Sequence, residues 1–168
     1  AIAGDIEAAE VPALLDRLRD DDPQSAVEAP EQRVLSRARL REAVLRDLSW
    51  LFNATRLATE VPLDDYPQVA QSVLNYGLPS LSGLTASSVD SVSLEADVRR
   101  AILDHEPRIL PESLRVQAEV SDDQLHQHNQ ISFRISGQLW AQPVPLELLL
   151  HTDVDLETGR VDVREMLR

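Results

Sequence analysis

The spacing of the hydrophobic positions changes near residue 110 of this chain. Between residues 31 and 105, apolar side chains recur every three or four positions, which is the period of helices with one buried face. After residue 114 they alternate with polar side chains, which is the period of strands with one buried face. This order predicts an α+β fold in which N-terminal helices pack on a small, mainly antiparallel sheet of three to four strands.

The strongest helical pattern covers residues 31–56, which contain neither glycine nor proline. Its apolar positions fall at spacings of 4, 4 and 3, at Leu40, Val44, Leu48 and Leu51. Its polar positions carry arginines, at Arg37, Arg39, Arg41 and Arg46. The segment is therefore predicted to be an amphipathic helix with a cationic outer side, which is either a solvated surface or a docking surface for an acidic partner.

A short helix is predicted to follow, because Pro67 suits the first turn of a helix and Gly77 with Pro79 suits its end. Its buried stripe is predicted to consist of Val69, Ala70, Val73 and Leu74. Residues 80–88 are predicted to form a loop.

A third helix is predicted from about Val89, with Ser87 and Asp90 at the spacing of N-terminal capping residues. Pro107 stops this helix near His105, because the residue before a proline avoids the helical conformation. Its apolar side consists of Leu94, Val98, Ala101 and Ile102.

Alternating apolar positions predict three strands, and a short fourth strand is predicted after the Thr158–Gly159 turn. Asp122–Asp123 and Gln142–Pro143 are predicted turns between the strands. The predicted strands lie around 114–120, 131–135, 146–150 and 161–163.

Residues 1–30 differ from the rest, with eight acids, two arginines and two late prolines, Pro23 and Pro30. They predict an acidic N-terminal arm that is partly flexible, followed by a single α+β domain over residues 31–168. A short apolar group in the arm suits either a helical turn docking on a surface or a flexible terminus: Val11, Leu14, Leu15 and Leu18.

Composition restricts the class of function. A chain of 168 residues is long enough for its own core, and zero cysteines exclude thiol catalysis and disulfide scaffolds. The net charge of -13 opposes nucleic-acid binding. The sequence has no run of about 18 apolar residues and no signal peptide, so we expect a cytoplasmic protein without direct membrane insertion.

Few residues have the pattern of a catalytic or metal site. His126, His128 and His151 are a conceivable set of metal ligands, but the stretch around the first two is typical of a polar hairpin loop. No phosphate-binding glycine loop and no nucleophile or zinc-protease signature occurs. We therefore expect no catalytic residues, cofactor, metal or small-molecule substrate, and predict that the protein is not an enzyme.

The Glu-Pro-Arg motif, Glu106–Pro107–Arg108, is the most informative short segment. In an extended segment the first and third side chains point to the same side, and Pro107 stiffens the backbone between them. The arginine favours the ionised carboxylate, which is the wrong state for a general acid. The pair is therefore either an internal salt bridge that ties helix to sheet or a recognition site for another protein.

Several short segments occur in an order and at separations that resemble a known family. The chain resembles the TssE baseplate subunits of bacterial type VI secretion systems, which belong to the lysozyme-like-named wedge family of contractile phage tails. The resemblance covers nearly the whole chain and is carried by the segments 14–18, 44–48, 51–56, 73–79, 82–83 and 106–108.

The resemblance implies a structural, cytoplasmic subunit of a membrane-docked baseplate, with TssF, TssG and TssK as partners and the sheath proteins TssB and TssC adjacent. It implies that Glu106, Pro107 and Arg108 contact the helical core bundle of the wedge. It also implies that a sheet edge helps to initiate sheath assembly by strand addition. The alternatives are the equivalent subunit of a phage tail or extracellular contractile device, and a cell-wall glycosidase.

Overall fold

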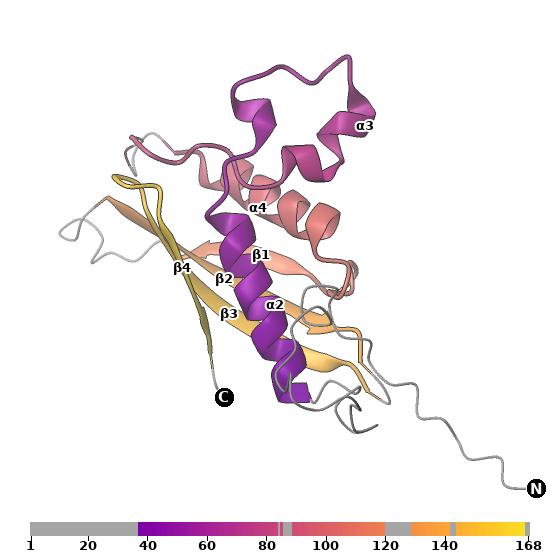
Figure 1. Ribbon diagram of the computed structural model, residues 1–168. Coiled ribbons are helices and arrows are strands. Elements are labelled where there is room, and N and C mark those ends of the chain that lie inside the picture. Colours follow the sequence, from indigo (N-terminus) through magenta and orange to yellow (C-terminus); the bar gives the residue numbers. More distant parts are fainter. Residues whose placement is uncertain (1–36, 84, 86–88, 120–128, 142–143, 167–168) are drawn as a thin grey trace, which may run out of the picture.

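The computed structural model describes residues 37–83, 85, 89–119, 129–141 and 144–166 (Figure 1). The helices in order are α2 (Arg37–Phe52), the 3-10 turn η2 (Leu57–Thr59), α3 (Pro67–Ala70), the 3-10 turn η3 (Val73–Asn75) and α4 (Ser91–His105). The strands are β1 (Arg115–Glu119), β2 (Gln130–Leu139), β3 (Leu146–Asp155) and β4 (Val161–Glu165). Helices followed by strands confirm the predicted α+β fold.

The sheet is a four-stranded antiparallel meander in the order β1-β2-β3-β4. Its central pair, β2 and β3, is in register from Gln130 opposite Asp155 to Leu139 opposite Leu146. Both strands extend beyond the predicted 131–135 and 146–150. The inward positions continue through Gly137 and Thr152, which are not hydrophobic and so do not extend the alternating pattern in the sequence.

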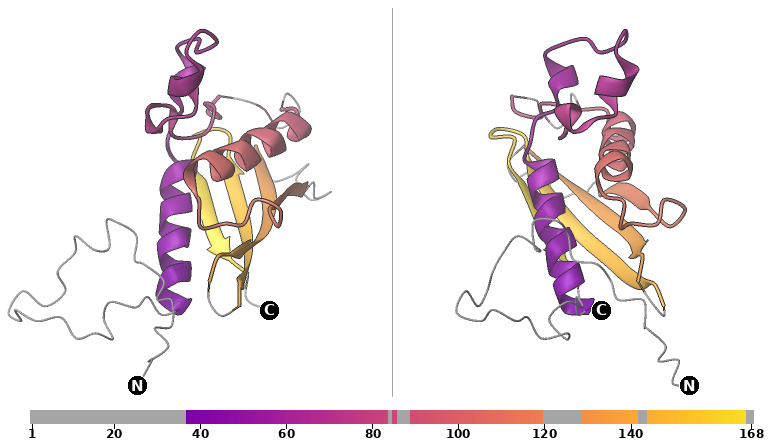
Figure 2. Two further views of the ribbon diagram at one scale, coloured as in Figure 1. Left: turned by 90° about the vertical axis from the view of Figure 1, so that its right-hand side faces the viewer. Right: turned by 45° about the vertical axis from the view of Figure 1, so that its right-hand side comes forward.

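Both long helices cover the same face of the sheet, with α2 packed on β4 and α4 packed on β1 (Figure 2). The core lies between the helices and that face, and all the predicted apolar positions of α2 and α4 are buried in it. The opposite face is polar, and it carries an ion-pair network of Glu119, Arg134, His151, Asp153 and Arg164. The described part of the molecule therefore has two layers, one of helices and one of strands.

The long helix is confirmed over Arg37–Phe52 and ends earlier than the predicted 56. Beyond Phe52 the chain pairs with a distant segment, because Leu78 N–H donates to Ala54 O (2.9 Å) and Arg56 N–H donates to Leu78 O (2.8 Å). Residues 31–36 lie outside the described residues.

The third helix begins at Ser91, slightly later than predicted, because Asp90 is its N-cap. The Asp90 carboxylate accepts hydrogen bonds from Val92 N–H (3.1 Å) and from the Ser93 hydroxyl (2.6 Å). Its end at His105 is confirmed. Ser87 lies outside the described residues.

Residues 57–76 form a protrusion between α2 and α4, which Figure 1 shows above the two-layer body. The predicted short helix exists as α3, but the predicted buried stripe is wrong. Val73 is 80% exposed and Leu74 is 66% exposed, while Val69 and Ala70 are only half-buried. The helical spacing does not lead to burial because the helix ends at Ala70 and no other described element covers this side.

The predicted arm of residues 1–30 and the predicted turns at 122–123 and 142–143 lie outside the described residues. No helix in the described ranges has the length and apolar character needed to cross a bilayer.

Candidate protein-binding site

The Glu-Pro-Arg motif lies immediately after α4, at the junction with the sheet. Glu106 closes the last turn of the helix, since its N–H donates to Ile102 O (2.8 Å). Ile109 N–H then donates to Glu106 O (3.2 Å), which closes a turn over Pro107 and Arg108. The expectation of an extended segment is therefore wrong here. The fixed backbone angle of proline suits the second position of a turn as well as it suits a strand.

Within the turn, Glu106 and Arg108 pair with each other. Arg108 Nε donates to Glu106 Oε1 (2.6 Å) and Arg108 Nη2 donates to Glu106 Oε2 (2.5 Å), so the contact is bidentate. The backbone N–H of Arg108 adds a bond to Oε1 (3.2 Å). Glu106 is only 3% exposed, and it is the one charged residue among those that the structure describes as buried. The internal salt bridge of the sequence analysis is therefore present.

A third residue, Asp47 of α2, completes the cluster. Arg108 Nη2 donates to Asp47 Oδ2 (2.6 Å) across a sequence separation of 61 residues. Arg46 pairs with the other oxygen of Asp47, with Nε at 2.9 Å and Nη2 at 2.8 Å. The four side chains form a row of alternating charge, which we call the charge cluster: Arg46, Asp47, Arg108 and Glu106. The cluster ties α2 to the end of α4.

Electrostatics keep Arg108 charged. Burial alone would lower the pKa of the guanidinium, but the hydrogen bonds and negative charges of Glu106 and Asp47 outweigh it and raise the pKa. The pKa of Tyr76 is also raised, by burial and by the same two carboxylates. The Tyr76 hydroxyl donates to Asp47 O (3.3 Å) and its ring meets His105 edge-on at 5.1 Å.

Asp47 was not predicted as part of the site. The signal in the sequence is slight, since Asp47 is one of only three acids in the basic segment 31–56. An acidic residue on an otherwise cationic helix side needs a basic neighbour, but the sequence does not specify which arginine supplies it.

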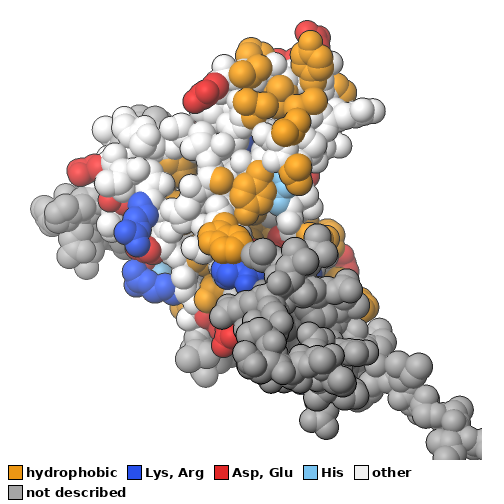
Figure 3. Space-filling model, viewed as in Figure 1, with side chains coloured by type: hydrophobic (Ala, Val, Ile, Leu, Met, Phe, Trp, Pro, Cys, Tyr) orange, Lys and Arg blue, Asp and Glu red, His pale blue; other side chains and the backbone are white. Residues whose placement is uncertain are grey.

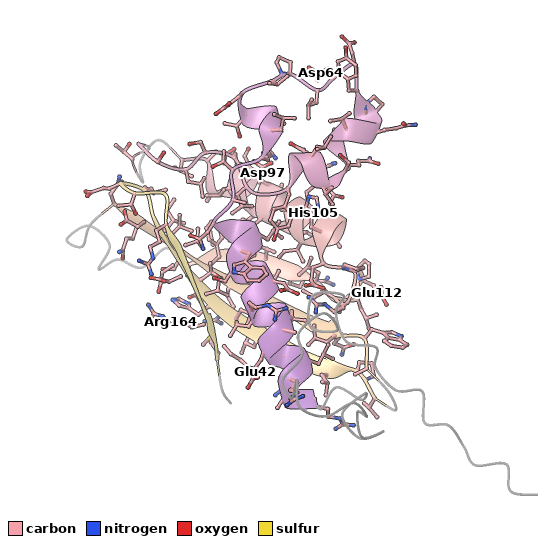
Figure 4. All side chains as sticks on the ribbon, viewed as in Figure 1. Glu42, Asp64, Asp97, His105, Glu112 and Arg164 are labelled. Atoms are coloured by element: carbon pink, nitrogen blue, oxygen red, sulfur yellow. The ribbon has the colours of Figure 1, made fainter. Side chains whose placement is uncertain are left out.

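The surroundings of the cluster contain both tryptophans of the chain. Trp140 N–H donates to Arg108 O (2.7 Å), and Trp140 is 50% exposed. Trp50 lies one helical turn after Asp47, is 51% exposed and carries the Arg46 guanidinium 5.1 Å from its ring centre. In Figure 4, His105 and Glu112 lie on one side of α2, and Arg164 lies on the other. Half-exposed tryptophan beside arginine is typical of protein interfaces.

Other segments of the family resemblance have internal contacts. The Asn53 amide bonds both backbone groups of Val161, through Nδ2 to the oxygen (2.8 Å) and through Oδ1 from the N–H (3.0 Å). Arg56 pairs with Asp97 of α4 (2.8 Å). Gly77 has φ +121°, and a Cβ there would lie 2.3 Å from Ala54 O. These residues hold the fold together around the candidate site.

Of the three histidines proposed as metal ligands, only His151 lies in the described residues. His151 contacts Glu119 Oε2 through Nδ1 (3.2 Å) and Asp153 Oδ1 through Nε2 (3.0 Å), whereas His126 and His128 lie outside the described ranges. No group of three or more potential metal ligands occurs in the part of the chain that the structure describes.

The surface hollows among the described residues include two of about 150 and 190 Å³. The first is lined by no acidic residue, and the second by a single one, Asp104. A glycosidase needs two carboxylates across one cleft, and neither hollow provides them.

The described residues thus form a small two-layer α+β domain with an internally neutralised charge cluster and two half-exposed tryptophans near it. The family model of baseplate wedge protein gp25 matches residues 38–144, and the chain belongs to that family, which includes the TssE subunits. It is thus a structural subunit of the baseplate of a contractile tail system. No curated protein and no solved structure matches the chain. The matched range includes α2, α4 and the Glu-Pro-Arg motif.

Proposed function

We propose that this chain is the TssE-type subunit of a type VI secretion baseplate and docks on the wedge through its Glu-Pro-Arg motif. Its partners are the wedge proteins TssF and TssG, with TssK nearby, on the cytoplasmic side of a membrane-docked baseplate. The observation that carries the proposal is the position of the motif: a family member holds Glu106–Pro107–Arg108 in a turn that is bonded to the half-exposed Trp140.

The charge cluster favours docking because it holds the turn in place and leaves its charges paired. Because Arg46 and Arg108 together neutralise Asp47 and Glu106, a partner that covers the turn removes few unpaired charges from water. Pro107 is exposed at the tip of this turn, and Trp140 is held beside Arg108 by a backbone hydrogen bond. Arg108 therefore acts as a positioning residue, while Pro107 and the tryptophans form the contact.

Initiation of the sheath of TssB and TssC is the second part of the proposal. Both backbone groups of Val161 bond to Asn53, so they point away from β3. Outward groups occur at every second residue of an antiparallel edge, which places those of Val163 and Glu165 at the same edge. A sheath strand that adds to β4 has these two residues available for pairing.

The docking test measures affinity for the co-expressed TssF–TssG complex by isothermal calorimetry. Wild type is expected to bind, and Trp140→Ser is expected to bind about tenfold or more weakly, because exposed interface tryptophans supply much of the binding free energy. Val92→Ser is the matched control, since Val92 is 71% exposed but lies at the far end of α4. Melting temperatures verify that each variant is folded.

Two results overturn the proposal. Equal affinity of wild type and Trp140→Ser means that the turn is not the docking site. A folded wild type that binds neither TssF nor TssG contradicts the type VI assignment, and binding to the wedge proteins of a phage tail or extracellular device then identifies the alternative. Clearing of a peptidoglycan suspension by the purified protein, with loss in Glu106→Gln, would instead indicate a glycosidase.

A further inference from the structure

The 57–76 protrusion exposes an unusual share of large apolar side chains. Five of the ten exposed large hydrophobic residues of the described chain lie in it: Leu57, Val61, Tyr66, Val73 and Leu74. None of residues 57–76 is buried. Figure 3 shows the orange side chains gathered over this part of the molecule. Isolated exposed apolar residues are common on protein surfaces, whereas a gathered set marks an interaction site.

Hydrogen bonds between its own segments hold the protrusion in shape. Asn75 links its two limbs, since Nδ2 donates to Ala70 O (2.8 Å) and Oδ1 accepts from Ala58 N–H (2.9 Å). Ser72 caps η3 by accepting from Leu74 N–H (3.2 Å). The backbone is thus fixed while the apolar side chains remain available to a partner.

Charge identifies the kind of partner. Residues 57–76 contain Glu60, Asp64 and Asp65 but no lysine or arginine. The acidic arm of residues 1–30 carries a net charge of the same sign, so it is a poor occupant, and an anionic lipid surface would be repelled. An apolar surface surrounded by arginine or lysine complements both the exposed apolar side chains and the negative charge of the protrusion.

We propose that the protrusion is a second docking surface, which binds a neighbouring baseplate protein through an apolar patch with a basic rim. It is separate from the contact at the Glu-Pro-Arg motif, although Tyr76 at its base touches Asp47 of the charge cluster. The proposal rests on membership of the baseplate family, and not on docking through the motif.

Photo-crosslinking in a reconstituted baseplate of this chain with TssF, TssG and TssK tests the proposal. A photoreactive benzoylphenylalanine replaces Leu74, or Val92 as the matched control, because both positions are apolar and more than half exposed. The expected result is a crosslink from position 74 to a partner segment flanked by arginine or lysine, in at least about tenfold the yield from position 92. Equal yields, or crosslinks from position 74 only to a second copy of this chain, overturn the proposal.

A second test measures the affinity of a double variant, Val73→Ser with Leu74→Ser. Both side chains are exposed, so the melting temperature should not change, while affinity for the reconstituted TssF–TssG–TssK complex should fall about tenfold or more. The binding of wild type should also weaken at higher salt concentration. An unchanged affinity with intact wild-type binding overturns this proposal alone, whereas a wild type that does not bind overturns the proposed function as well.

Discussion

Arg108 forms ion pairs with two carboxylates, one after α4 and one on α2. Its guanidinium bonds both oxygens of Glu106, which is 3% exposed, and one oxygen of Asp47 on α2. A carboxylate so far removed from water is stable in its ionised form only with a positive partner. The residue therefore links docking surface and fold stability, and variants of it need a folding measurement beside any binding measurement.

Arg108→Ala is expected to lower the free energy of unfolding by about 3 kcal/mol, because it leaves Glu106 buried without its cation. Urea denaturation measures the change. The matched control is Arg164→Ala, whose side chain is 67% exposed and whose ion pair with Asp153 should contribute below about 1 kcal/mol. Similar losses in the two variants would contradict the assigned role of Arg108.

Gly77→Ala is expected to destabilise the protein by more than about 3 kcal/mol, since the new Cβ would lie 2.3 Å from Ala54 O at a φ of +121°. Gly83→Ala provides the control for backbone strain alone, because Gly83 has φ +80° with nothing within 4 Å of the added carbon. Its loss should be about 1 kcal/mol. Thermal unfolding of both variants separates the steric clash with Ala54 from backbone strain. Equal losses of stability in the two variants would exclude a clash at residue 77.

At this scale the sequence identified Glu106, Pro107 and Arg108, because proline and opposite charges are local signals. It did not identify Asp47, whose bond to Arg108 spans 61 residues. Gly77 was predicted to end the short helix, and the structure gives it a positive φ two residues after the 3-10 turn η3. The close approach of Ala54 depends on chain pairing that no local pattern contains.

Among the elements, Asn53 directly after α2 bonds the first residue of β4. Asn53→Ala is expected to remove both hydrogen bonds to Val161, to cost about 1–2 kcal/mol, and to speed hydrogen exchange at the Val161 amide. Asn53→Asp keeps the acceptor for that amide but loses the Nδ2 donor, so it should retain more of the protection. An unchanged exchange rate in Asn53→Ala would mean that other contacts anchor β4.

The start of α4 depends on pH through Asp90. Hydrogen bonds from the Ser93 hydroxyl and the Val92 N–H lower the pKa of Asp90 below its ordinary value of 3.8. Because the folded pKa is the lower one, the cap stabilises α4 above pH 3.8 and the contribution is lost as pH falls through the folded pKa. The melting temperature of wild type should therefore fall more steeply in acid than that of Asp90→Asn. Parallel curves would contradict this role.

Helix existence and type could be predicted from apolar spacing, whereas helix ends could not. α2 ends before residue 56 because residues 54–56 pair with Leu78, and α4 begins after Asp90 because that side chain caps it. The error at Val73 and Leu74 has a different cause. Their spacing favours burial, but no element among the described residues covers them.

In the whole molecule, alternation of apolar residues was sufficient to predict an antiparallel sheet with helices packed on it. It was not sufficient to predict which surfaces remain uncovered. The exposed tryptophans near the charge cluster and the apolar protrusion are both visible only after the chain has folded. They give a small baseplate subunit two surfaces through which it could join neighbouring proteins.

Hydrogen exchange of the chain, alone and bound to TssF–TssG, tests the central claim most directly. If the wedge docks on the Glu-Pro-Arg turn, peptides that cover residues 106–112 and 138–141 should gain protection on binding. Peptides of the polar outer sheet face, around Arg134 and His151, should change little. A complex that forms with protection only outside the turn would contradict docking through Glu106, Pro107 and Arg108.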